Sequence, residues 1–178
     1  IGAGSQAISA EVLSDGLGAV TSPGRLQLLG IAPTVLVDAA HNPHGARALA
    51  TALRESFDFD QWGVVVGVLG DKDADGILDA LAPIAAHVFA TAPASDRADE
   101  PDAIADLAEA RGLTVTVHDD LAGAAEAARE WASSAERRAV VIAGSVVLAG
   151  EAITLAEAED WKAGYSAWAL NAKPDSLE

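Results

Sequence analysis

The sequence predicts an α/β fold, with a doubly wound and mostly parallel sheet that carries helices on both faces. Two observations support this prediction. Short runs of β-branched and apolar residues alternate with longer amphipathic stretches through most of the 178 residues. Apolar residues make up 51% of the chain, with alanine and valine supplying much of that share, which suits helices packed closely on a buried sheet.

The expected elements follow in order along the chain. A helix at 7–17 precedes a short strand pair at 25–29 and 34–38. Further strands are expected at 63–69, 87–91, 113–118 and 139–143, and they alternate with helices at 43–55, 77–86, 101–111 and 121–136. A last helix begins after Ser145 and runs to about 160, and a short helix and loose tail follow it. Right-handed crossovers then give a Rossmann-like sheet.

The chain length suits one domain that buries its core without metals or disulfides. We expect that domain at 23–160, with a helix and linker at 1–22 before it and a C-terminal extension at 161–178 after it. The sequence opens without Met and ends in Ser-Leu-Glu, features that fit a domain cut from a longer protein.

The charge and composition exclude several classes of function. The chain carries 11 Lys and Arg against 27 Asp and Glu, a net charge of −16, which argues against a nucleic-acid surface and against docking on anionic lipid. It has no Cys, so disulfides and thiol catalysis are excluded. No apolar run approaches the roughly 20 residues of a membrane span, and no signal peptide opens the chain. We therefore expect a cytoplasmic protein without nucleic-acid or membrane partners.

Ligands of open α/β sheets bind beyond the carboxyl ends of the strands. Polar residues gather at one such end, where the strand at 34–38 gives way to a helix. Asp38 could accept hydrogen bonds from both hydroxyls of a ribose, or it could cap a backbone turn. His41 could offer a hydrogen bond or a positive charge to a substrate carboxylate. Asn42 suits the N-cap before Pro43, so an ordinary capped turn remains an alternative.

Four further residues are open to more than one interpretation, and the simpler one is structural in each case. Ser145 could donate to an anion or cap the last helix, and Gly144 before it allows a tight turn or a close ligand. Arg25 could reach a nucleotide phosphate or base, or it could stay exposed after its turn. Lys72 stands between two aspartates in a loop, where a solvated loop is the simpler interpretation. No residues show metal-ligand spacing, and neither a GxxxxGK[ST] loop nor a GxGxxG turn occurs.

Four segments, taken together and in order, carry a family resemblance. They are Ser-Pro-Gly-Arg-Leu-Gln at 22–27, Val-Asp-Ala-Ala-His-Asn-Pro at 37–43, Gly-Val-Leu-Gly-Asp-Lys-Asp at 67–73 and Ala-Gly-Ser-Val-Val-Leu-Ala-Gly at 143–150. The chain resembles the bifunctional folylpolyglutamate synthase and dihydrofolate synthase family of Mur-type ligases, and it resembles only their C-terminal domain. It departs mildly at Gln27, where the family often has Glu, and at Ala39, where many members have Gly.

The resemblance implies an ATP-dependent ligase that adds L-glutamate to folates or dihydropteroate through an acyl phosphate. It implies that Arg25 and Asp38 contact ATP, the latter through the ribose. It implies that His41 and Ser145 help bind glutamate.

The resemblance gives no firm role to Asn42, Lys72 or Gly144. It also implies no catalytic residue in this domain alone, because the P-loop, the Mg²⁺ ligands and a carbamylated lysine lie on an N-terminal ATPase domain of the same protein. Two alternatives stay open. One is the C-terminal domain of a peptidoglycan Mur ligase, which the Asp-x-Ala-His-Asn-Pro form disfavours. The other is a free-standing, non-catalytic α/β ligand-binding module.

Overall fold

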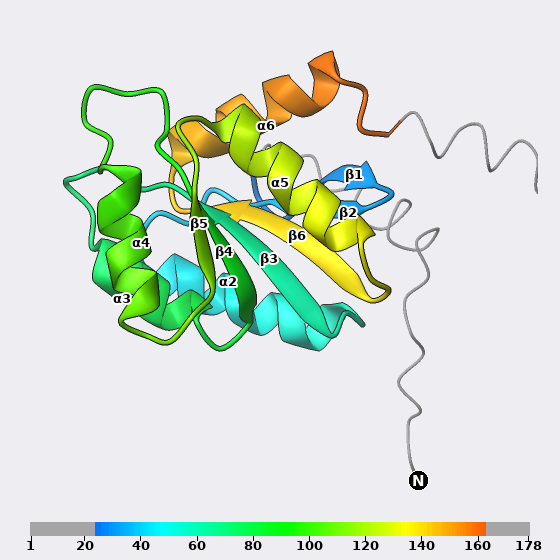
Figure 1. The fold of residues 1–178 in the computed structure, drawn as a ribbon, viewed down its shortest axis with the longest axis horizontal. Helices are drawn as coiled ribbons and strands as arrows, with labels where there is room; N and C mark the ends of the chain where they lie inside the picture. The colour runs from blue at the N-terminus through cyan, green and yellow to red at the C-terminus, as the bar shows by residue number, and fades with distance from the viewer. Residues whose placement is uncertain (1–23, 163–178) are drawn as a thin grey trace, which may run out of the picture.

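A computed structural model describes residues 24–162 of the chain, and the helix expected at 7–17 and nearly all of the expected extension lie outside that range. Six strands form one sheet in the order β1-β2-β6-β3-β4-β5, in which only the β1–β2 pair is antiparallel (Figure 1). The strands are β1 Gln27–Ile31, β2 Thr34–Val37, β3 Gln61–Val66, β4 Ala85–Ala90, β5 Val115–Val117 and β6 Arg138–Ala143. The prediction of a mostly parallel α/β sheet with an initial strand pair is confirmed.

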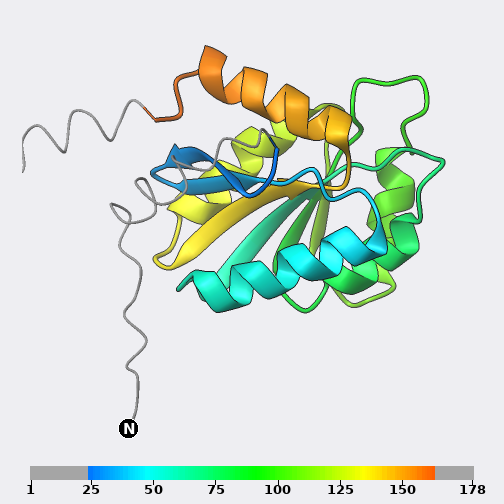
Figure 2. The same ribbon diagram turned by 180° about the vertical axis from the view of Figure 1, so that it is seen from behind.

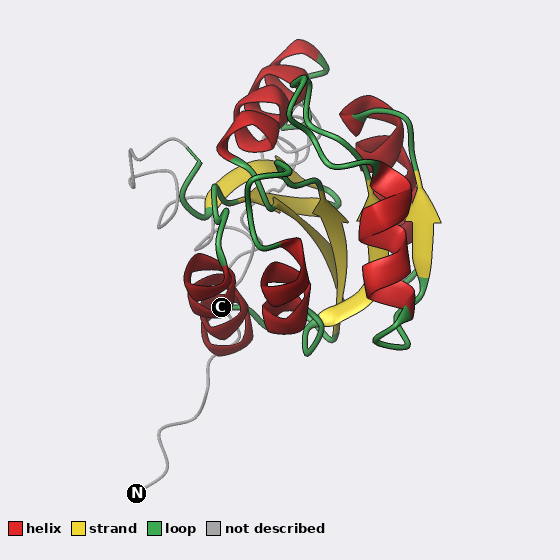
Figure 3. Cartoon of the chain, turned by 90° about the vertical axis from the view of Figure 1, so that its left-hand side faces the viewer, coloured by secondary structure: helices red, strands yellow, loops and turns green. Residues whose placement is uncertain are grey.

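Helices cover both faces of this sheet. They are α2 Pro43–Ser56, α3 Ala74–Leu81, α4 Pro101–Glu109, α5 Leu121–Ser133 and α6 Val146–Ala158. The first three lie on one face and the last two on the other, as the two opposite views and the side view show (Figures 1, 2 and 3). Each face has its own apolar core, because alternate residues of a strand point to opposite sides. Along β6, Val141 packs with the α2 side and its neighbours Val140 and Ile142 pack with the α5 side.

The strand order creates a switch point at the carboxyl edge of the sheet. The last strand, β6, lies between β2 and β3, so Val37 of β2 is paired with Ile142 of β6. The chain leaves β2 toward α2 on one face, whereas it leaves β6 toward α6 on the other. Loops that diverge from neighbouring parallel strands open a crevice between them, and ligands of doubly wound sheets bind there.

The boundaries predicted for the third helix were wrong. It was expected at 77–86, but it begins at Ala74 because the Asp73 side chain accepts a hydrogen bond from Gly76 N–H at 2.9 Å and so caps the helix start. It ends at Leu81 because Pro83 has no N–H with which to continue it. The next strand consequently begins at Ala85 rather than at 87.

Other strands begin or end a few residues away from their expected bounds. The strand expected at 25–29 begins at Gln27, because Leu26 has a φ of 43° that bends the chain before the sheet. The strand expected at 63–69 leaves the sheet after Val66, and the backbone then bonds to the loop near 97–99 instead. Edge strand β5 is shorter than its expected range of 113–118. Within 24–162, no helix is both long and apolar enough to cross a membrane.

Candidate functional site

Asp38 lies at the centre of the candidate site, directly after β2. One carboxylate oxygen accepts the N–H of Leu26 at 2.9 Å and the other accepts the N–H of Ala40 at 2.8 Å. The side chain therefore does cap the backbone, and it also ties the turn before β1 to the loop after β2. Each oxygen keeps a second lone pair, so the carboxylate can accept further donors from a ligand.

The surroundings of Asp38 leave its charge poorly solvated. Burial raises the pKa of this carboxyl above its ordinary value of 3.8, although the N–H groups of Leu26 and Ala40 and the positive charge of Arg25 act in the opposite direction. A carboxylate that has lost water gains more from extra hydrogen-bond donors than an exposed one does. A pair of neighbouring hydroxyls, such as those of a ribose, would supply two.

A cavity of about 490 Å³ opens beside Asp38. Its polar lining includes the predicted residues Arg25, Asp38, His41 and Asn42, so the structure brings four of the sequence candidates together. Arg25 is exposed at the rim, where its guanidinium is available to an anion.

The apolar wall of this cavity was not predicted. It is formed by Leu26, Ala48, Leu49, Ala52 and Val146, most of them on the flank of α2. An apolar wall in the same cavity as a carboxylate and a guanidinium suits a ligand that has both a ring and polar groups. The sequence predicts the helix at 43–55 but does not indicate which of its apolar residues line a cavity.

His41 and Asn42 directly precede α2 and are held by local hydrogen bonds. The carbonyl of Ala39 lies 2.9 Å from Nδ1 of His41, so this nitrogen carries the hydrogen and donates it. The other ring nitrogen, Nε2, is then the atom left for a ligand. Asn42 is the N-cap, as predicted, and its side-chain oxygen accepts the N–H of Gly45 at 2.8 Å.

Gly144 joins the loops that follow β2, β3 and β6. Its N–H donates to the carbonyl of Ala40 at 2.9 Å, and a Cβ at this position would lie 2.8 Å from the carbonyl oxygen of Gly67. Its φ of 110° also disfavours a residue with a side chain. The glycine is therefore required where three strand ends meet.

Ser145 caps α6, which was the simpler of its two interpretations. Its hydroxyl oxygen accepts the N–H groups of Val147 at 3.1 Å and Leu148 at 3.5 Å. The side chain is only 1% exposed, and the next residue, Val146, lines the cavity in its place. The hydroxyl can still donate its own hydrogen, so a contact with glutamate stays a prediction that requires close approach of the ligand to the loop.

Lys72 stands apart from this cavity. Its ammonium group pairs with the adjacent Asp71 at 2.9 Å, and that pairing lowers the pKa of the Asp71 carboxyl. These contacts agree with the interpretation that Lys72 belongs to a solvated loop. Among residues 24–162, no group of three or more His, Asp or Glu side chains is arranged to hold a metal ion.

Two helix N-termini meet at this edge of the sheet, those of α2 and α6. Neither has an acidic residue in its first turn, although the chain holds 27 acidic residues. Neutral caps therefore satisfy some of their N–H groups, but no acidic side chain in the first turns offsets the partial positive charge of the two helix ends, which favours an anionic ligand.

The fold matches that of a known family of ligase domains. A family model described as "Mur ligase, glutamate ligase domain" matches residues 24–146, and the chain belongs to that family. Among its relatives, the dihydrofolate synthase/folylpolyglutamate synthase of Mycobacterium tuberculosis is 42% identical over 171 residues, which are 86% of this chain and 34% of that protein.

Solved structures agree with this assignment. The folylpolyglutamate synthase of Mycobacterium tuberculosis, complexed with ADP, has a TM-score of 0.74 and 44% identity over 82% of this chain and 35% of its own. The FolC protein of Escherichia coli, in complex with DHPP and ADP, has a TM-score of 0.69 and 26% identity over 88% of this chain and 36% of its own. The chain thus spans about a third of the length of these relatives.

Proposed function

We propose that this chain is the glutamate- and nucleotide-contacting C-terminal domain of an ATP-dependent ligase, which adds L-glutamate to folates or dihydropteroate. The observation that carries the proposal is that Arg25, Asp38 and His41 line the same cavity. The N-termini of α2 and α6 lie beside this cavity, and neither has an acidic residue in its first turn. Relatives whose names describe this activity support it. We place the enzyme in the cytoplasm.

The nucleotide fits the Asp38 end of the cavity. The carboxylate has unused lone pairs for the two ribose hydroxyls, and the apolar wall at Leu26 and Leu49 offers a surface to a flat base. Arg25 at the rim can meet a phosphate. The solved relatives complexed with ADP make a nucleotide the expected ligand here.

Glutamate fits the other end, where α2 begins. The free Nε2 of His41, when protonated, donates to a carboxylate of the amino acid, and the N-terminus of α2 adds a favourable field. Ser145 would contribute a donor from the start of α6. These groups bind and orient the amine for attack.

The reaction itself needs a second domain. A carboxyl group of the pterin substrate is first phosphorylated at the expense of ATP. The amine of glutamate then attacks the acyl carbon, and phosphate leaves as the amide forms. We propose that the P-loop and the Mg²⁺ ligands lie on an N-terminal ATPase domain of the same protein, so that this domain contributes binding and positioning. No step through a metal ion is assigned to residues 24–162.

Two experiments test the proposal on the 178-residue chain. We expect it to release no phosphate from ATP by itself. Clear release of phosphate from ATP would refute the proposal that the reaction needs a second domain. In a thermal-shift screen, ADP should raise the Tm modestly in the chain and not in the Asp38→Asn variant. A shift with a folate alone, and none with ADP or glutamate, would instead favour a free-standing binding module.

A further inference from the structure

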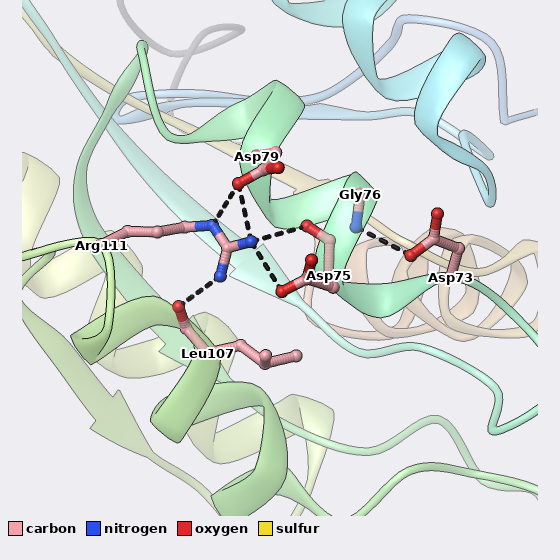
Figure 4. A network of polar contacts seen from close by, with 6 residues as sticks. All are labelled: Asp73, Asp75, Gly76, Asp79, Leu107 and Arg111. Carbon is pink, nitrogen blue, oxygen red and sulfur yellow. Dashed lines mark hydrogen bonds and ion pairs between the residues drawn. The ribbon is translucent and has the colours of Figure 1, made fainter.

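A polar network on the α2 face of the sheet lies outside the cavity and has no part in the proposed chemistry. Arg111, just after α4, makes four hydrogen bonds through its guanidinium (Figure 4). Nε donates to the Asp79 carboxylate at 2.7 Å, and Nη1 donates to the carbonyl of Leu107 at 2.6 Å. Nη2 donates to both the carbonyl and the carboxylate of Asp75, at 3.0 and 2.8 Å.

This network holds the first turn of α3. Asp75 and Asp79 are one helical turn apart on the outer side of α3, and without a cation between them their charges would repel. The helix has only 8 residues, too few to be stable alone, so its position depends on its neighbours. The planar guanidinium fixes both aspartates at once and ties them to α4, which a single-point charge cannot do.

The same turn of α3 touches the beginning of α2. Gly76, directly after Asp75, lies so close to Pro43 that a Cβ on it would come within 2.6 Å of the proline Cγ. Pro43 is the first residue of α2 and directly follows Asn42 and His41. Contacts therefore run without a gap from Arg111 through Asp75 and Gly76 to the residues that begin α2.

We propose that Arg111 is a positioning residue for the glutamate end of the site: it holds the first turn of α3 against Pro43, and so fixes where α2 presents His41. The inference rests on the proposed function for its effect on glutamate. Asp38 lies outside this route, because its carboxylate is held by the backbone of Leu26 and Ala40. Loss of Arg111 therefore disturbs glutamate binding and spares the nucleotide.

Arg137 offers a matched control at the opposite edge of the sheet. Its guanidinium also lies between two aspartates, with Nη2 2.7 Å from Asp58 and Nε 2.7 Å from Asp60, where β6 begins. Arg137→Gln removes a comparable fork far from the start of α2. Both variants lose a guanidinium between two aspartates, but only the Arg111 network leads to the site; the Arg111 side chain is also less exposed, at 15% against 46% for Arg137.

The first test uses the backbone amide signals of the 178-residue chain in a ¹H–¹⁵N correlation spectrum. Arg111→Gln should shift the signals of His41, Asn42 and Gly45, and Arg137→Gln should leave them in place. If the Arg111 variant leaves these signals unchanged, the proposal fails whatever the enzyme does. Arg111→Lys, which keeps the charge but not the fork, should give an intermediate shift and provides a milder variant if the glutamine variant unfolds.

The second test measures steady-state kinetics of the full ligase that contains this chain. Arg111→Gln should raise the KM for glutamate roughly three- to tenfold with little change in the KM for ATP, because a misplacement of ~1 Å can cost about 100-fold and the displacement expected here is smaller. Gly76→Ala leaves Arg111 in place, but its Cβ would come within 2.6 Å of both Pro43 and the Asp73 carboxylate that caps α3, so it should displace the same turn and act in the same direction. Equal effects of Arg111→Gln and Arg137→Gln on KM would overturn the proposal. An enzyme without any glutamate dependence would refute the proposed function instead, and the amide shifts would still decide the positioning role.

Discussion

Gly144→Ala is the substitution whose effect the structure predicts most sharply. The alanine would have to adopt a φ of 110°, which costs about 1–3 kcal/mol for a residue with a side chain. Its Cβ would also meet the carbonyl oxygen of Gly67 at 2.8 Å, and relieving such crowding costs a further ~1–3 kcal/mol. The expected loss of unfolding free energy is therefore about 2–6 kcal/mol, out of a total that is commonly about 5–15 kcal/mol.

Alanine variants at two other glycines allow the cost of the positive φ and the cost of steric crowding to be measured separately. Gly112 has a φ of 72°, but a Cβ added there would have no heavy atom within 4 Å, so its replacement by alanine should cost only the backbone term of about 1–2 kcal/mol. Gly150 lies inside α6 with nothing within 4 Å and no unusual φ, so alanine there should stabilise the chain by ~0.5–1 kcal/mol.

Urea unfolding of the three variants, followed by circular dichroism, gives the assay. The predicted order of stability is Gly150→Ala above the parent chain, then Gly112→Ala, then Gly144→Ala. If Gly144→Ala were no less stable than Gly112→Ala, the close meeting of three strand ends at this position would be wrong. The cavity geometry, which depends on the Gly144 bond to Ala40, would then need revision.

Two other predictions concern stability. Burial, and then the charges of His118 and Arg138, hold the pKa of His87 below its ordinary value of 6.5, so the unfolded chain binds more protons near that pH and the unfolding free energy should fall as the pH drops below about 6.5. His87→Gln should flatten that fall in urea titrations at several pH values, and an unchanged slope would contradict the assignment. Asn42→Ala removes the N-cap of α2 and should cost about 1 kcal/mol, whereas Asn42→Asp should stay near the parent value, and equal losses in both would argue against capping.

Much of the fold could be predicted because its pattern is local. Buried strands such as 139–143 appear as apolar runs, and the stretch from Asp38 to Pro43 is continuous, so its residues had to lie together. The start of α3 was not predicted because Asp73 was placed in a loop, whereas it caps the helix. The end was not predicted because the expected range of 77–86 includes Pro83, which cannot continue a helix.

Local sequence patterns could not predict how segments that are distant in the sequence are arranged in space. Nothing in the apolar run of β6 indicates that it inserts between β2 and β3, yet that position makes the crevice. The hydrogen bond from the Leu26 N–H to the Asp38 carboxylate holds Arg25 near the cavity, and it also depends on tertiary contacts. The apolar wall on α2 was missed because the sequence shows which residues are apolar, but not which part of a helix surface a neighbouring strand leaves uncovered.

The most direct test of the central claim compares Asp38→Asn and His41→Ala in the full ligase, with the KM for ATP and for glutamate measured separately. Each change removes hydrogen bonds to a charged group, worth about 1.5–3 kcal/mol and so roughly tenfold or more in affinity. We predict that Asp38→Asn raises the KM for ATP and leaves that for glutamate nearly unchanged, and that His41→Ala does the reverse. Equal effects of both variants on both substrates, or none, would contradict the division of this cavity into a nucleotide end and a glutamate end.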